Sequence, residues 1–132
     1  MSIDPRLVSD TLLVCESHSA SIRLMNDSRW PWLILIPHAT DATELHELPP
    51  QVCSAFLADV NQTSRLMKQE TGCTSVNIAM LGNVVSQLHC HVVARNHGDP
   101  NWPAPVWGFE KATPYNADLP QTLLAAVVKS FS

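Results

Sequence analysis

Apolar and polar residues alternate in several short stretches of the first third of the chain. Residues 11–16 and 21–25 favour β-strands, and the polar segment 17–20 between them predicts a hairpin. The run WLILI at residues 32–36 is apolar without interruption and ends at Pro37, which is typical of a central strand covered on both faces. This part of the chain therefore predicts three strands.

A helical pattern begins at Pro49, and its stripe of mainly apolar residues recurs every three or four positions: Val52, Phe56, Val60, Thr63 and Met67. Gly72 is suited to end this helix, because glycine readily adopts the left-handed conformation of a C-cap. Residues 75–81 predict a further strand. A last helix is expected from about Asp118, with Pro120 near its first turn.

Strands at the start, one long central helix, further strands and a C-terminal helix predict an α+β fold. The length of 132 residues and the 45% hydrophobic content fit a single domain spanning residues 1–132. The N-terminus lacks a basic start followed by a long apolar run, and no apolar segment approaches the roughly 20 residues that span a bilayer. We therefore expect a cytoplasmic protein without a membrane partner.

The charge and the cysteines narrow the possible partners. A net charge of −4 argues against binding to a nucleic acid polymer, which rests on neutralising many phosphates with Lys and Arg. No Cys-x-x-Cys pair of the kind found in zinc or redox motifs is present. We expect reduced and mostly buried thiols at Cys15, Cys53, Cys73 and Cys90.

The candidate chemistry lies in residues 87–91, QLHCH, where polar and apolar residues alternate. On a β-strand, Gln87, His89 and His91 would share one face, and the apolar residues between them would face the core. Neighbouring residues on one face lie about 6.7 Å apart, which lets both imidazoles and the amide converge on one phosphate-sized group.

The segment QLHCHVVAR at residues 87–95 resembles the signature of the histidine-triad (HIT) superfamily of nucleotide hydrolases and transferases. Gln87 stands in place of the first histidine of that signature. The preceding segment GNVVS is similar to the lead-in of the family motif, and VVAR is similar to the tail found in dinucleoside polyphosphate hydrolases. The segment NWP at residues 101–103 resembles a feature of the phosphoramidase branch.

The resemblance implies a mainly antiparallel five-stranded sheet, usually paired in a homodimer, and a small-molecule nucleotide as partner. His89 falls on the nucleophile of the family, which attacks the α-phosphorus while a backbone carbonyl on the same strand holds the other ring nitrogen. Neutral imidazole is a competent nucleophile near pH 7, so no metal or other cofactor is required. His91 falls on a position that contacts phosphate oxygens, and a protonated or proton-donating imidazole there would offset developing charge.

Gln87 departs from the family pattern in a chemically meaningful way. A glutamine donates and accepts hydrogen bonds, but it cannot carry charge or transfer protons as imidazole does. Trp32 stands where relatives place a histidine that supports the first histidine of the triad. These two replacements together suggest one repacked unit.

The resemblance also indicates nucleotide-binding residues, each with an alternative interpretation. Asn26 resembles a residue that binds the ribose hydroxyls, with Asp27 as the substitute, and both are also ordinary turn formers. Asn83 is placed to hold the α-phosphate or to serve in the turn after Gly82.

A guanidinium at Arg95 is suited to distal phosphates, although an exposed arginine at the end of a strand is equally compatible with the sequence. Three tryptophans in loops are suited to stacking on a base or to packing at a dimer interface: Trp30, Trp102 and Trp107.

Three functions fit these observations. The favoured one is an enzyme that cleaves an α-phosphate linkage, in a dinucleoside polyphosphate or a nucleoside phosphoramidate, through a covalent nucleotidyl-histidine. The second is a nucleotide-binding or sensing module without turnover. The third is a metal site at His89 and His91. The sequence argues against it, because no carboxylate or cysteine stands at ligand spacing on the same face of the strand.

Overall fold

Five antiparallel strands form a single sheet in the order β1-β2-β3-β5-β4. The computed structural model describes residues 2–39 and 41–132. Its strands are β1 (Thr11–Glu16), β2 (Ala20–Met25), β3 (Trp32–Pro37), β4 (Ser75–Ala79) and β5 (Cys90–Arg95). Its helices are α1 (Pro5–Asp10), the 3-10 helix η1 (Leu45–Glu47), α2 (Pro50–Thr71) and α3 (Gln121–Phe131). The predicted α+β fold with one long helix and a C-terminal helix is confirmed.

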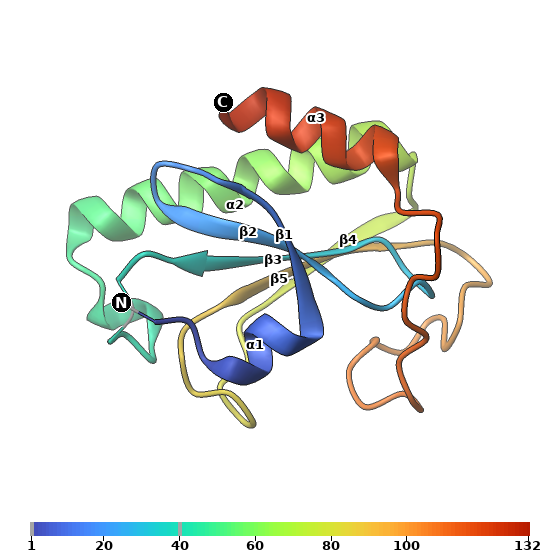
Figure 1. The fold of residues 1–132 in the computed structure, drawn as a ribbon, viewed down its shortest axis with the longest axis horizontal. Coiled ribbons are helices and arrows are strands. Elements are labelled where there is room, and N and C mark those ends of the chain that lie inside the picture. Colours follow the sequence, from blue (N-terminus) through green and yellow to red (C-terminus); the bar gives the residue numbers. More distant parts are fainter. Residues whose placement is uncertain (1, 40) are drawn as a thin grey trace.

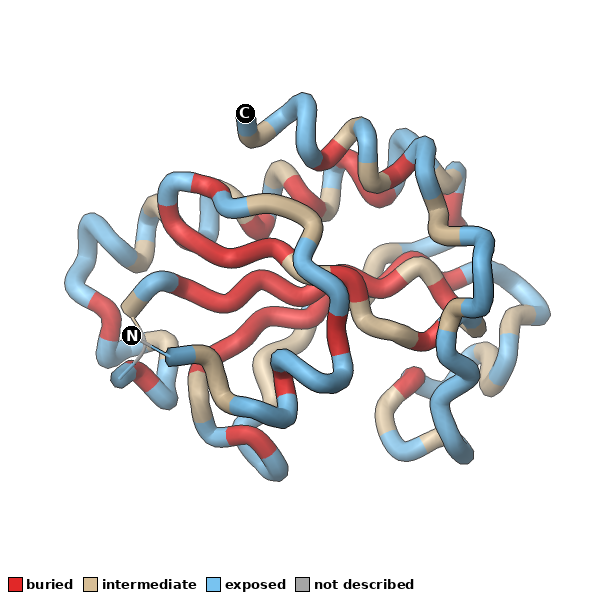
Figure 2. The backbone as a smooth tube through the Cα atoms, in the orientation of Figure 1, coloured by how far each residue is buried: buried red, intermediate tan, exposed pale blue. Residues whose placement is uncertain are grey.

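The sheet has a helical face and a loop face (Figure 1). Helices α2 and α3 lie along one side, whereas α1 and the long loops before and after β5 lie on the other. Strand β3 is buried from end to end, as its unbroken apolar sequence predicts, and Figure 2 shows this buried run in the middle of the sheet. Its alternate residues serve both sides, because Leu33 and Leu35 belong to the core under the helices while Ile34 and Ile36 belong to the core under the loops.

Helix α2 begins and ends where the sequence predicts. Its first residue is a proline, whose fixed backbone angle suits the first helical turn. Gly72 ends it at φ 63°, and the Gly72 amide donates to the Lys68 carbonyl. The predicted stripe is buried at Phe56, Val60, Thr63 and Met67, but the prediction is wrong for Val52, which lies in the first turn and is 37% exposed.

Strand β5 begins later than the sequence predicts. Gln87 and His89 precede it, because residues 80–89 form an irregular connection in which the Leu88 amide donates to the Ala42 carbonyl instead of to a neighbouring strand. Helix α3 begins at Gln121, just after Pro120. The two short elements α1 and η1 escaped prediction because six and three residues carry too little periodicity.

All four cysteines lie within the described residues and are free, with Cys73 and Cys90 buried and Cys15 and Cys53 half-buried. Over residues 2–39 and 41–132, no helix combines the length and the apolar character needed to cross a bilayer. The homodimer and the cytoplasmic location remain predictions.

Candidate active site

His89 and His91 lie together on the loop face of the sheet. His91 is in β5, opposite Ile34 of β3, and His89 is two residues earlier, just before the strand. The ring centroids are 4.9 Å apart, the planes are inclined at 71°, and each residue is 5% exposed. The two imidazoles therefore share one face, as predicted, although only one of them is in the strand.

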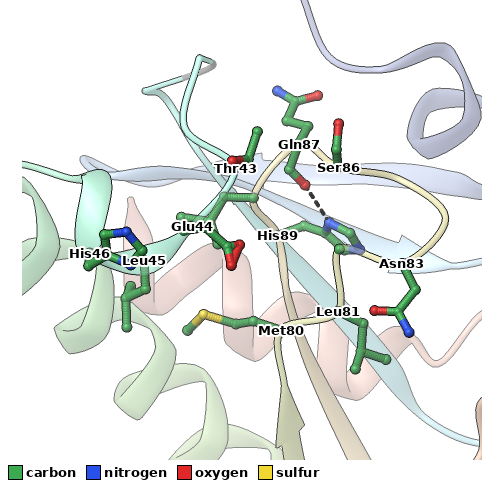
Figure 3. A pocket seen from close by; sticks show the side chains of 12 residues that line it. Thr43, Glu44, Leu45, His46, Met80, Leu81, Asn83, Ser86, Gln87 and His89 are labelled. Atoms are coloured by element: carbon green, nitrogen blue, oxygen red, sulfur yellow. Dashed lines mark hydrogen bonds between the residues drawn. The ribbon is translucent and has the colours of Figure 1, made fainter.

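A backbone carbonyl fixes the tautomer of His89. Its Nδ1 lies 2.6 Å from the carbonyl oxygen of Gln87 (Figure 3). A carbonyl oxygen only accepts, so Nδ1 must carry the proton and Nε2 must carry the free lone pair. No hydrogen bond between described residues uses that Nε2. His89 is thus held in the form that a nucleophile requires.

His91 is held in the opposite tautomer. The indole N–H of Trp32 donates to His91 Nδ1 over 3.0 Å, and an indole can only donate, so the proton of His91 must be on Nε2. Burial, together with a smaller electrostatic effect of the neighbouring His89 imidazole, lowers the pKa of His91 to about 3. His91 is therefore a neutral hydrogen-bond donor at physiological pH, and the protonated alternative is excluded.

The side chain of Gln87 faces the N-terminal segment. Its Oε1 accepts a hydrogen bond of 2.7 Å from the Asp4 amide, and its buried Nε2 has no partner among the described residues. Trp32 bonds to His91 instead, because it lies in β3 directly beside β5 while Gln87 precedes β5. The two replacements therefore do not form one unit, contrary to the expectation from the sequence.

Two hollows with shared lining residues lie on the loop face, and the first of them adjoins the histidines. The first, the apolar hollow, has a volume of about 340 Å³ and is lined by His89 and His91 together with Leu7, Ile34, Val85 and Trp107. The second, the loop hollow, has a volume of about 390 Å³ and is lined by Asn26, Asp27 and Phe109 among others. Trp107 lines both, and the volume of each hollow is in the range of small-molecule sites.

A third hollow lies next to His89 and is polar (Figure 3). This polar hollow has a volume of about 510 Å³, and its lining includes Glu44, His46 and Asn83. His89 and Asn83 line both the polar and the apolar hollow. A group bound at His89 can thus extend into two chemically different spaces.

Trp107 is the aromatic residue of the long loop that reaches the histidines. Its ring lies 5.3 Å from that of His91 and 6.2 Å from that of Trp32, and its buried Nε1 has no hydrogen-bond partner in the described part of the chain. The sequence identified it only as one of three loop tryptophans. The other two are elsewhere: Trp30 is buried in the core, and Trp102 packs against His97.

The structure does not bring Arg95 or Trp102 to the histidines, and neither lines any of the three hollows. Arg95 is 1% exposed and forms two bonds of 2.8 and 2.7 Å with the carboxylate of Asp99, together with a 2.8 Å bond to the Ala104 carbonyl. Its guanidinium shapes the loop after β5, and is not free to bind a distal phosphate.

Asn26 and Asp27 combine a structural role with a position on the loop hollow. Asn26 Oδ1 accepts from the Tyr115 amide over 2.9 Å. The buried Asp27 carboxylate pairs with Arg29 at 2.8 and 2.9 Å and also accepts from the Thr113 amide. These bonds fix the loop after β2 against the segment that precedes α3.

Two buried or partly buried carboxyls, Asp27 and Asp99, make the stability depend on pH. Burial alone would raise each pKa, but hydrogen bonds from Arg29 to Asp27 and from Arg95 to Asp99 outweigh it and lower both. Their contribution is fully present above the unfolded pKa of about 3.9 and is lost as the pH falls through the lower folded values.

We expect Asp27→Asn to lower the free energy of unfolding by about 3 kcal/mol at pH 7, because the substitution removes the carboxylate that pairs with the charge of Arg29. The difference from wild type should shrink at pH 3. Denaturant unfolding at both pH values measures it, with the exposed Asp118→Asn as control. An equal loss of stability at both pH values would contradict the assignment.

No group of three or more His, Cys, Asp and Glu side chains that could hold a metal ion exists among residues 2–39 and 41–132. Asn83 is exposed beside His89, where the sequence expects a phosphate-binding residue. The site within the described residues thus consists of two imidazoles of opposite tautomer, a surrounding apolar surface and a polar space.

Comparisons with known proteins identify the family of the chain. The model of the HIT domain matches residues 6–98. A histidine triad (HIT) protein from Sinorhizobium meliloti 1021 is 43% identical, with a TM-score of 0.92 over 97% of this chain and 95% of the other. The chain belongs to the HIT domain family.

Two further crystal structures show the same similarity. A histidine triad protein from Bradyrhizobium japonicum is 34% identical, and one from Marinobacter aquaeolei VT8 is 35% identical. Each has a TM-score of 0.94 over 99% of this chain and 98% of its own. A search of curated protein sequences found no match.

Proposed function

We propose that this protein cleaves an α-phosphate linkage of a nucleotide, in a nucleoside phosphoramidate or a dinucleoside polyphosphate, through a nucleotidyl-histidine at His89. The observation that carries the proposal is the bond between His89 Nδ1 and the Gln87 carbonyl, which leaves Nε2 with its lone pair. The catalytic contribution of Gln87 is then this backbone carbonyl.

The reaction proceeds in two displacements. His89 Nε2 attacks the α-phosphorus, the bond from phosphorus to the leaving group breaks, and the electron pair departs with the leaving group, which takes a proton from solvent. Water then attacks the same phosphorus and releases His89, so that a nucleoside monophosphate is formed. The Gln87 carbonyl stabilises the positive charge that the ring carries between the two steps.

His91 binds the phosphate as a neutral hydrogen-bond donor. Its Nε2–H, fixed by the Trp32 bond, donates to a nonbridging oxygen as negative charge gathers there. The apolar and loop hollows receive the nucleoside, with Trp107 beside the base or ribose. We assign to Asn83, which lines the apolar hollow together with His89, a contact to the same phosphate.

The second candidate function is nucleotide binding without turnover. It is favoured by Gln87, whose side chain bonds to the Asp4 amide and cannot transfer a proton to a leaving group. This candidate predicts tight binding of substrate that is recovered unchanged.

Steady-state assays in EDTA distinguish the two functions. We expect repeated turnover of adenosine phosphoramidate or of a diadenosine polyphosphate to AMP, because neither histidine needs a metal. Binding of both compounds without release of AMP would establish the binding module instead.

A further inference from the structure

We propose that residues 2–10 form a strap that closes the nucleotide site, and that the side chain of Gln87 is the latch that holds the strap in place. This inference rests on the proposed function, because it requires a nucleotide to bind beside His89 and His91. It gives Gln87 a positioning role that is separate from the contact of its backbone carbonyl with His89.

The strap crosses the loop face of the sheet next to the histidines. Figure 1 shows the chain running from the N-terminus past the start of β5 and into α1. Leu7 is 4% exposed and belongs to the same apolar core as Trp32 and Val85. Leu7 lines the apolar hollow, Ser9 lines the loop hollow and Asp10 lines both. The strap is therefore one wall of the space in which we place the nucleoside.

A single side chain joins the first half of the strap to the loop that carries the nucleophile. The Asp4 amide donates to Gln87 Oε1 over 2.7 Å, and this is the one hydrogen bond between described residues that ties residues 2–6 to the chain beyond the strap. The backbone carbonyl of Gln87 holds His89 Nδ1. Gln87 thus contacts the nucleophile with its main chain and the strap with its side chain.

The other end of the strap is tied more firmly. The buried Thr11 hydroxyl donates to the Leu7 carbonyl over 2.5 Å and accepts from Arg23 Nε over 2.6 Å. The Asn26 amide donates to the Asp10 carbonyl over 2.9 Å. Segments with few buried contacts open locally at the lowest cost in free energy. The end beside Gln87 is therefore the end that opens.

Latching and nucleotide binding favour each other in this arrangement. A ligand shifts an equilibrium between two states by the difference between its affinities for them. A nucleoside in the hollows contacts the lining residues of the strap only while the strap is closed. Loss of the latch should therefore weaken nucleotide binding and leave the groups that react with phosphorus unchanged.

Two variants at residue 4 isolate the latch. Asp4→Pro removes the N–H, and the φ of Asp4, −49°, is close to the angle that proline fixes. Asp4→Ala keeps the N–H and removes the same carboxylate, which caps α1 by accepting from the Arg6 amide. We expect the calorimetric Kd for AMP to be about two- to tenfold higher in Asp4→Pro than in Asp4→Ala, the usual net effect of one hydrogen bond. With adenosine phosphoramidate the same difference should appear in KM and not in kcat.

Gln87→Leu removes the acceptor of the same bond and retains the backbone carbonyl. It should weaken AMP binding in the Asp4→Ala background and have no further effect in the Asp4→Pro background, because both substitutions break one interaction. An equal effect of Gln87→Leu in the two backgrounds, or equal affinities of Asp4→Pro and Asp4→Ala, would overturn the inference.

Hydrogen exchange reports the position of the strap directly. The amides of Leu7 and Val8 donate to the Asp4 carbonyl over 2.9 and 3.2 Å, and proline at residue 4 retains that carbonyl. Both amides should exchange faster in Asp4→Pro than in Asp4→Ala, and AMP should slow their exchange in wild type. The amides of α3 are the remote reference. Exchange of the strap that AMP does not alter relative to α3 would show that the strap does not close on a nucleotide.

These measurements separate failure of the inference from failure of the proposed function. A protein that binds AMP through a latched strap but cleaves neither compound contradicts the proposed function and supports the latch. Turnover with an affinity and a KM that ignore the latch contradicts the inference alone. A wild type that neither binds AMP nor cleaves adenosine phosphoramidate overturns both.

Discussion

Replacement of His89 by glycine is expected to lower kcat by about 10⁴-fold or more, the loss that follows removal of a covalent nucleophile. The expectation rests on the position of His89, whose Nδ1 is held by the Gln87 carbonyl and whose Nε2 is free. Nucleotide binding should persist, because the apolar and loop hollows keep the rest of their lining. Steady-state rates and calorimetric affinities measure the two effects separately.

His89 is nearly buried, so the variant must be shown to fold. Circular dichroism and thermal unfolding provide that control, and His89→Gln provides a second variant that fills more of the space. A folded His89→Gly protein with kcat within tenfold of wild type would exclude His89 as the nucleophile.

Trp32→Phe is expected to lower kcat by about 5- to 150-fold with little change in KM. The substitution keeps an aromatic ring but removes the N–H that holds His91 Nδ1. Loss of one partner of a buried hydrogen bond costs about 1–3 kcal/mol, which corresponds to that range of rates. His91 then takes either tautomer, and only one of them presents an N–H to the phosphate.

Trp30→Phe is the matched control for this substitution. Its indole N–H donates to the Pro100 carbonyl over 3.0 Å, and its ring packs in the same core as Trp32. Both variants should lose stability, but only Trp32→Phe should change kcat.

The pH profile and NMR provide readouts that a purely structural role would not affect. Because burial lowers the pKa of His91 to about 3, wild type should show no loss of activity from its protonation until the pH approaches that value. Nitrogen-15 shifts should report the Nε2–H tautomer in wild type and a mixture in Trp32→Phe. An unchanged tautomer together with an unchanged kcat would show that Trp32 does not position His91.

Much of the fold could be predicted from local sequence patterns. The unbroken apolar run of β3 and the three- and four-residue spacing of α2 are strong signals, because each stretch carries its own burial pattern. The start of β5 could not be predicted in this way. The alternation in residues 87–91 resembles a strand, but the Leu88 amide bonds to the Ala42 carbonyl, a distant contact that no local pattern encodes.

The main residues of the site could be predicted from the sequence, but the hydrogen bonds that join them to distant residues could not. His89 and His91 stand out in the sequence, whereas the Trp32–His91 bond joins residues 59 positions apart and the Asp4–Gln87 bond joins residues 83 positions apart. The assignment of Arg95 to phosphate overlooked Asp99, which follows it by four residues and engages its guanidinium. Asp99 is visible in the sequence, but the turn that brings its carboxylate back to Arg95 is not.

Intact-mass analysis during a single turnover tests the central claim most directly. Protein in excess is mixed with adenosine phosphoramidate in EDTA, quenched without acid and compared with His89→Gly. We predict a transient, acid-labile increase by one adenylyl group that peptide mapping assigns to His89 and that is absent from the variant. Formation of AMP without any adduct, or an adduct on another residue, would contradict the covalent mechanism at His89.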